Sequence, residues 1–156
     1  MKSPLLFATV AILFAAAAPA ADTWSYDQLN DQADLVIIAT PVSVKDLGEN
    51  TFLPGIQEMG PDGKAMPIPA QGLESNFEIE AKLKGNWPLD RIVLYYLRET
   101  SPPAQSAPGG PMLVTFDPKK KVRYLMFLKL DKDGRFVPVT GQTDPGLAIK
   151  ELGVNP

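Results

Sequence analysis

The chain has 156 residues, a formal net charge of −3, and neither histidine nor cysteine. Without imidazole or thiol groups it can form no Ser-His-Asp triad, no thiol nucleophile and no ordinary zinc site. The excess of carboxylates argues against a nucleic-acid partner, because phosphate backbones require concentrated lysine and arginine. The sequence therefore assigns no catalytic residues, no cofactor and no metal ligands.

Residues 1–20 have the pattern of a cleavable secretory signal peptide. Lys2 precedes an apolar run that ends at Ala18, and Ala18 and Ala20 occupy the two positions of a small-residue cleavage site. We therefore expect the mature chain to begin at Ala21, or one residue later. A membrane anchor is the alternative, but the apolar run is shorter than the roughly 20 residues that span a bilayer. The pattern predicts an exported protein, periplasmic or extracellular, without stable membrane insertion after processing.

The mature sequence begins with a predicted short helix over residues 23–33. Thr23 or Ser25 can act as its N-cap, because a hydroxyl oxygen accepts hydrogen bonds from the free amides of the first turn. Tyr26, Leu29 and Ala33 are spaced at i, i+3 and i+7 and fall on one helix face. We expect that face to pack on the element that follows.

A long strand follows the helix. The apolar, β-branched run 35–39 predicts burial of both strand faces. After Pro41, which can mark a bend, Val42 and Val44 alternate with polar residues and predict one buried face. Residues 47–72 are rich in glycine and proline and contain a Gly-Pro-Asp-Gly turn signal, so they predict a protruding loop with at most a small hairpin of its own.

Four further segments have strand patterns. In 77–84 every second residue is apolar, which predicts that Leu83 and the other odd-numbered residues face the core. The other three predicted strands are residues 91–98, 122–130 and 135–139. The segment 122–130 is apolar enough to be a central strand.

The remaining mature sequence predicts one loop and one helix. Residues 99–121, with several prolines and glycines, predict an exposed loop. Thr143 or Asp144 is predicted to cap a terminal helix that has Pro145 in its first turn and ends at Gly153.

Together these elements predict a mainly β fold in a single domain over residues 21–156, with long loops at 47–72 and 99–121. The absence of βαβ alternation argues against a parallel doubly wound sheet. We expect a small closed or partly open five-stranded Greek-key, OB-like barrel with short N- and C-terminal helices, because closure removes exposed strand edges.

Three segments resemble strands of bacterial secreted proteins with a TIMP-like, or netrin-like, OB-fold barrel. They are the Ala-Asp-hydrophobic strand at 33–42, the strand at 77–85 with its Leu-Lys-Gly ending, and the Tyr-Leu-hydrophobic-Phe strand at 123–128. The group's name implies inhibition of metalloproteases, in which an N-terminal cysteine chelates the protease zinc. This chain has no cysteine, and therefore no residue here corresponds to the zinc-chelating cysteine of those inhibitors. The resemblance implies a barrel and leaves the function open.

The candidate ligand-binding residues are Trp87, Tyr95, Tyr96 and Arg98. Consecutive strand residues face opposite ways, so one tyrosine ring should point inward and the other outward. The outward ring, Trp87 and Arg98 could form a platform for a sugar or a peptide on the barrel face, as OB folds often do. Ordinary packing beneath the long loops is the alternative interpretation.

Three other motifs have simpler explanations. The segment 131–134 has the start of a calcium loop but lacks its later ligands, and an Asp-Gly hairpin turn explains it. Glu78 and Glu80 could act as an acid–base pair, but alternation with apolar residues indicates a solvated strand face. The lysine run 119–121 could bind an anionic surface, and a solvated turn that protects a strand edge is the more frequent use of such a run.

These observations predict a non-enzymatic binding or interaction module whose partner is an extracytoplasmic protein or a saccharide. Function tends to lie on loops that a rigid scaffold holds, so we expect the long loops at 47–72 and 99–121 to supply the contacts. A secreted protease inhibitor acting through an exposed loop and a carboxylate-based hydrolase are the alternatives.

Overall fold

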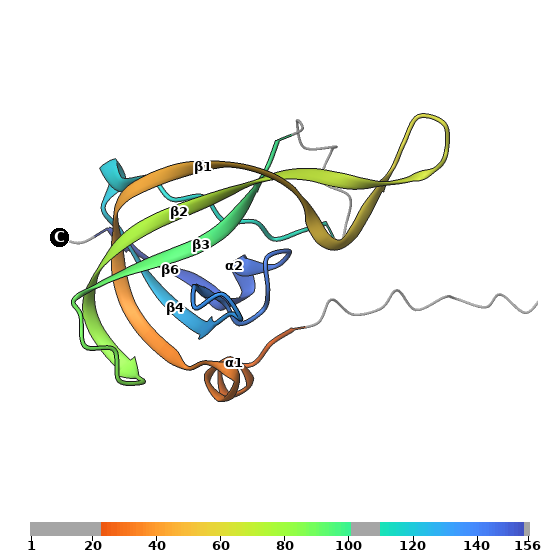
Figure 1. Cartoon of the computed structure of the whole chain (residues 1–156). Helices are drawn as coiled ribbons and strands as arrows, with labels where there is room; N and C mark the ends of the chain where they lie inside the picture. Colours follow the sequence, from red (N-terminus) through yellow and green to blue (C-terminus); the bar gives the residue numbers. More distant parts are fainter. Residues whose placement is uncertain (1–22, 101–109, 155–156) are drawn as a thin grey trace, which may run out of the picture.

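Strands dominate the computed structural model, which describes residues 23–100 and 110–154 (Figure 1). The signal-peptide prediction lies outside the described residues. The elements follow in the order α1 (Tyr26–Gln32), β1 (Leu35–Met59), β2 (Ala65–Lys84), β3 (Arg91–Glu99), the 3-10 helix η1 (Pro118–Lys120), β4 (Val122–Leu130), β5 (Phe136–Pro138), α2 (Pro145–Ala148) and β6 (Ile149–Val154). Within the described ranges, no helix is both long and apolar enough to cross a membrane.

Five strands close into a ring in the order β1-β2-β3-β5-β4, and β4 pairs back onto β1. All of these pairs are antiparallel except β3 with β5, which is parallel and has a single bridge at Leu94 and Phe136. The mainly β, OB-like barrel that the sequence predicts is therefore confirmed. The β3–β5 contact, which we call the seam, is the least paired part of the ring.

The last ring position is filled by a broken strand. β5 pairs with the C-terminal end of β4, and β6 pairs with the N-terminal part of β4, from Val122 to Met126. β5 and β6 thus follow one another along the same edge of β4, with α2 inserted between them. This arrangement leaves β3 with only the short β5 as its neighbour on that side.

Side chains from every strand of the ring fill the barrel interior. Phe116, from the connection before η1, lies among them, with its ring centroid 4.9 Å from Phe77, 5.1 Å from Tyr96 and 5.2 Å from Tyr124. All three contacts are edge-to-face, a geometry that aromatic pairs favour. The buried cluster comprises Leu35, Ile37, Ala39, Leu73, Phe77, Ile92, Leu94, Tyr96, Phe116, Met126, Leu128, Phe136 and Ile149.

The helix α1 is shorter than the predicted helix at 23–33, and its Ser25 cap is confirmed, but only part of the predicted face packs. Ser25 is its N-cap and forms a capping box with Gln28, in which each side chain binds the other residue's backbone amide. Leu29 is buried with Val36 in a second cluster outside the ring, whereas Tyr26 is exposed. Val36 faces this cluster and its neighbours face the interior, so the two-sided burial predicted for the start of β1 is confirmed.

The loop predicted over 47–72 is wrong, because these residues form the outer parts of β1 and β2 (Figure 1). The two strands extend beyond the ring as a long hairpin that turns at residues 60–64. Register shifts in β1 between Asp46 and Asn50 and between Phe52 and Gln57 interrupt the alternation of period two. This interruption explains why the segment has no strand pattern in the sequence.

Three predicted core positions are exposed. Val42 and Val44 lie on β1 after it leaves β4, where no other element covers them, so the predicted one-sided burial is wrong. Leu83 is exposed because β2 extends past its pairing with β3, which ends at Glu78. Alternation predicts which residues share a strand face, and only neighbouring elements decide whether that face is covered.

The C-terminal helix is shorter than the sequence predicts. α2 has only four residues, Pro145–Ala148, and the chain from Ile149 onward forms β6 because β4 offers an unpaired edge there. Asp144 is the N-cap residue, but its side chain accepts a hydrogen bond from the Met112 amide at 3.1 Å and makes no cap bond. Of the predicted loop 99–121, residues 101–109 lie outside the described ranges, and 118–120 form η1.

We expect Gly85→Ala to lower the free energy of unfolding by about 3 kcal/mol. Gly85 has φ +87°, and a Cβ atom there would collide with the backbone oxygen of Asp34. Gly134→Ala is the matched control, because Gly134 has φ +74° and open space around it; its expected loss is about 1 kcal/mol. Urea unfolding measures both values, and equal losses would contradict the close contact at Gly85.

Candidate functional site

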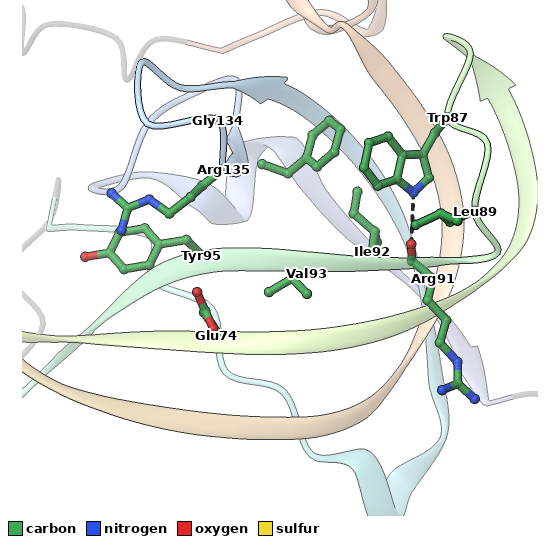
Figure 2. Close-up of a pocket in the computed structure, with 10 residues that line it drawn as sticks. Glu74, Trp87, Leu89, Arg91, Ile92, Val93, Tyr95, Gly134 and Arg135 are labelled. Atoms are coloured by element: carbon green, nitrogen blue, oxygen red, sulfur yellow. Dashed lines mark hydrogen bonds between the residues drawn. The ribbon is translucent and has the colours of Figure 1, made fainter.

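A cavity of about 400 Å³ lies at the seam, within the range of small-molecule sites. Its walls come from β2, the β2–β3 connection, β3, the β4–β5 turn and the start of β5 (Figure 2). The apolar lining residues are Trp87, Leu89, Ile92, Val93 and Phe136, and the others are Glu74, Arg91, Tyr95, Gly134 and Arg135. We call this space the seam cavity.

Two contacts hold Trp87 in place in the apolar wall of the seam cavity. Its indole N–H donates a hydrogen bond of 2.9 Å to the backbone oxygen of Arg91 (Figure 2). Its ring lies edge-to-face on Phe136, with 5.0 Å between the ring centroids. Leu89 and Val93 extend this wall and are 57% and 42% exposed. The wall is therefore preformed, and part of its apolar surface is open to solvent.

Arg135 and Tyr95 form the polar end of the seam cavity. The Arg135 guanidinium lies 4.0 Å from the centre of the Tyr95 ring, a cation–π contact. The same guanidinium forms ion pairs with Asp131 at 3.2 Å and Asp133 at 3.3 Å. The charge of Arg135 is thus already balanced within its own turn.

The β4–β5 turn positions Arg135 through Asp131. One carboxylate oxygen of Asp131 accepts hydrogen bonds from the Asp133 amide at 2.9 Å and the Arg135 amide at 2.8 Å. Burial alone would raise the pKa of Asp131, but these bonds and the Arg135 charge outweigh it and lower the pKa. The polar hairpin turn predicted at 131–134 is confirmed.

The hydroxyl end of Tyr95 lies against Gly72 and Glu49. A Cβ atom at Gly72 would lie 3.0 Å from both the Tyr95 hydroxyl and a Glu49 carboxylate oxygen, so glycine makes the space in which this ring packs. Burial, followed by the negative charge of Glu49, raises the pKa of Tyr95. The ring is therefore neutral at physiological pH and fixed on both sides.

The structure separates the four residues of the predicted platform. Trp87 and Tyr95 both line the seam cavity. Tyr96 points into the barrel, where it is 2% exposed and its hydroxyl lies 3.4 Å from that of Ser75. Arg98 hydrogen-bonds Gln71 at 2.7 Å and pairs with Asp46 at 3.2 Å, away from the cavity lining. The inward and outward orientations predicted for the two tyrosines are confirmed, and Trp87 and Tyr95 are the two candidate residues that the structure brings to one cavity.

Sequence reasoning missed Glu74, Val93 and Arg135. Val93 shares the outward face of β3 with Tyr95, so strand alternation could have found it. Arg135 follows the Asp-Gly turn directly, but nothing in the sequence shows that this turn lies beside β3. Glu74 is opposite Tyr95 in the β2–β3 register, which becomes visible only once the strands are paired.

The other charged motifs do not converge on the seam cavity. Glu78 and Glu80 are both exposed; Glu80 accepts a hydrogen bond from the Thr40 hydroxyl at 2.6 Å and lies 3.9 Å from Arg123. The lysine run 119–121 lies in and just after η1, exposed before β4. Among the described residues, no group of three or more Asp, Glu, His or Cys side chains could hold a metal ion.

The fold defines a small five-stranded barrel protein with a cavity at its parallel seam. Scans against protein-family models and curated proteins return no match.

We expect Asp131→Asn to lower the free energy of unfolding by about 1–2 kcal/mol at pH 7, because the amide accepts weaker hydrogen bonds. The folded pKa of Asp131 is lowered, so its stabilisation is fully present above the unfolded pKa and is lost as pH falls through the folded pKa. The difference from the parent chain should therefore shrink below about pH 4.

Urea unfolding between pH 3 and 7 measures this difference. Asp133→Asn is the control, because the only ion pair of the Asp133 side chain among the described residues is the exposed one with Arg135; this substitution should cost less than about 0.5 kcal/mol. A loss for Asp131→Asn that does not change with pH would contradict the assigned role of this carboxylate.

Proposed function

We propose that this protein is an exported, non-enzymatic binding module that holds a protein or saccharide ligand in the seam cavity. The observation that carries the proposal is a preformed cavity of about 400 Å³ with Trp87, Leu89 and Val93 on its partly open apolar wall. Binding sites characteristically combine apolar walls with a few fixed polar groups. Export is proposed from residues 1–20, which have the pattern of a signal peptide.

The chemistry of the lining favours binding over hydrolysis. Glycoside hydrolysis usually needs two carboxylates on either side of the scissile bond. Glu74 is the one carboxylate among the residues that line the seam cavity. Asp131 and Asp133 lie nearby, but both are engaged with Arg135. A binding role does not require a pair of carboxylates. It also gives the apolar wall a function, which carboxylate-based hydrolysis does not.

The resemblance to the TIMP-like group remains a proposal that rests on the strand patterns at 33–42, 77–85 and 123–128. It is compatible with a ring of five strands and adds no functional residue, since the chain has no cysteine. The binding proposal stands without it.

We expect Val93→Tyr to reduce ligand affinity at least about tenfold, because the larger ring fills the seam cavity. Val42→Tyr is the matched control: both valines are 42% exposed on a strand, and Val42 lies on β1 away from the cavity. The probes are panels of short peptides and oligosaccharides, and the readout is the indole ¹⁵N–¹H signal of Trp87 in the ¹⁵N-labelled full chain.

Trp24, the other tryptophan of the chain, provides an internal reference for this measurement. A ligand that shifts the Trp87 signal in the parent chain and in Val42→Tyr, but not in Val93→Tyr, supports the proposal. A panel without any ligand that shifts Trp87, or binding that survives Val93→Tyr, contradicts it.

A further inference from the structure

Glu74 gives the seam cavity a negative charge that no ion pair among residues 23–100 and 110–154 neutralises. It lines the cavity beside Tyr95 and Val93 (Figure 2). The ion pairs among the described residues all join other side chains. Lys45 lies opposite Glu74 in the β1–β2 register, and no ion pair joins the two. A half-buried carboxylate on an apolar wall favours a cationic partner.

The two arginines at the seam cavity do not supply that partner. Arg135 is paired with Asp131 and Asp133 and stacked on Tyr95. The side chain of Arg91 points away from Trp87 and Tyr95, while its backbone oxygen holds the indole (Figure 2). With Arg135 balanced by its own turn and the Arg91 side chain directed away, Glu74 is a carboxylate of the cavity lining that none of these ion pairs engages.

The apolar wall selects what kind of cation fits. Trp87, Leu89 and Val93 offer a surface for an aliphatic stem, and lysine side chains bury such stems while keeping the ammonium in a polar environment. The Tyr95 face, where a guanidinium would stack, is already occupied by Arg135.

The polar groups at the seam cavity argue against a saccharide. The Trp87 indole N–H is used by the Arg91 backbone, and Arg135 donates to Asp131 and Asp133. Sugar hydroxyls need several donors and acceptors, because buried polar groups are costly without partners. The single carboxylate of Glu74 is better suited to bind one strong hydrogen-bond donor, such as an ammonium group, than to bind a set of sugar hydroxyls.

We propose that the seam cavity accepts a lysine side chain of a partner polypeptide, with the ammonium at Glu74 and the aliphatic stem along Trp87 and Val93. This inference rests on the binding function proposed above and names its ligand class. Affinity should fall as ionic strength rises, since the ion pair is partly exposed.

The test titrates the ¹⁵N-labelled full chain with N-acetyl-Ala-Lys-Ala-amide and with matched peptides that carry norleucine or arginine in place of lysine. Norleucine keeps the stem and removes the charge. We expect the lysine peptide to shift the Trp87 indole signal and leave Trp24 unchanged, and the other two peptides to bind at least about fivefold more weakly.

Glu74→Gln should lower the affinity for the lysine peptide about fivefold and leave that for the norleucine peptide unchanged. Glu78→Gln is the matched control on the same strand, exposed and outside the cavity lining, and should leave both affinities unchanged. Circular dichroism checks that both variants fold. The comparison of lysine and norleucine peptides uses the parent chain and does not depend on any variant folding.

The outcomes separate the two proposals. If norleucine or arginine peptides bind Trp87 as tightly as the lysine peptide, or if only oligosaccharides do, the lysine inference is overturned and the binding function stands. If neither peptides nor oligosaccharides shift Trp87 while the chain is folded, both proposals fall.

Discussion

Closure of the barrel depends on β1 pairing with two strands at once. Over residues 35–39 it hydrogen-bonds β4 on one edge and β2 on the other. Its side chains face alternately the barrel interior and the cluster under α1, so this short run is buried on both faces. Fully burying each large aliphatic side chain contributes about 1.5–3 kcal/mol, which makes this segment a strong constraint on the ring. Beyond Pro41, β1 leaves β4 and continues into the hairpin.

The seam cavity is a consequence of how the ring ends. Because β5 and β6 share the edge of β4 and α2 separates them, β3 keeps one bridge to the ring on that side, between Leu94 and Phe136. Wherever the hydrogen-bonded ladder stops, side chains must fill the opening. Trp87 and Arg135 do so only partly, and the space that remains has one apolar wall and one carboxylate, Glu74.

Local patterns predicted the elements whose physics is local. The Ser25 cap, the apolar run at 35–39, the alternation at 91–98 and the Asp-Gly turn before Arg135 each depend on nearby residues, and each appears in the structure. The hairpin at 47–72 was missed because register shifts in β1 break its alternation. Of the predicted platform, the tyrosine orientations followed from strand geometry. The positions of Arg135 and Glu74 at the cavity could not be predicted, because they depend on which strands are neighbours.

The central claim is that the seam cavity exists, with fixed walls, in the free protein. A nuclear Overhauser spectrum of the unliganded chain tests it most directly. The account predicts cross-peaks between the Trp87 indole and the Phe136 ring, which lie 5.0 Å apart between centroids, together with slow solvent exchange of the indole N–H. An indole that exchanges rapidly and shows no contact with Phe136 would contradict a preformed wall.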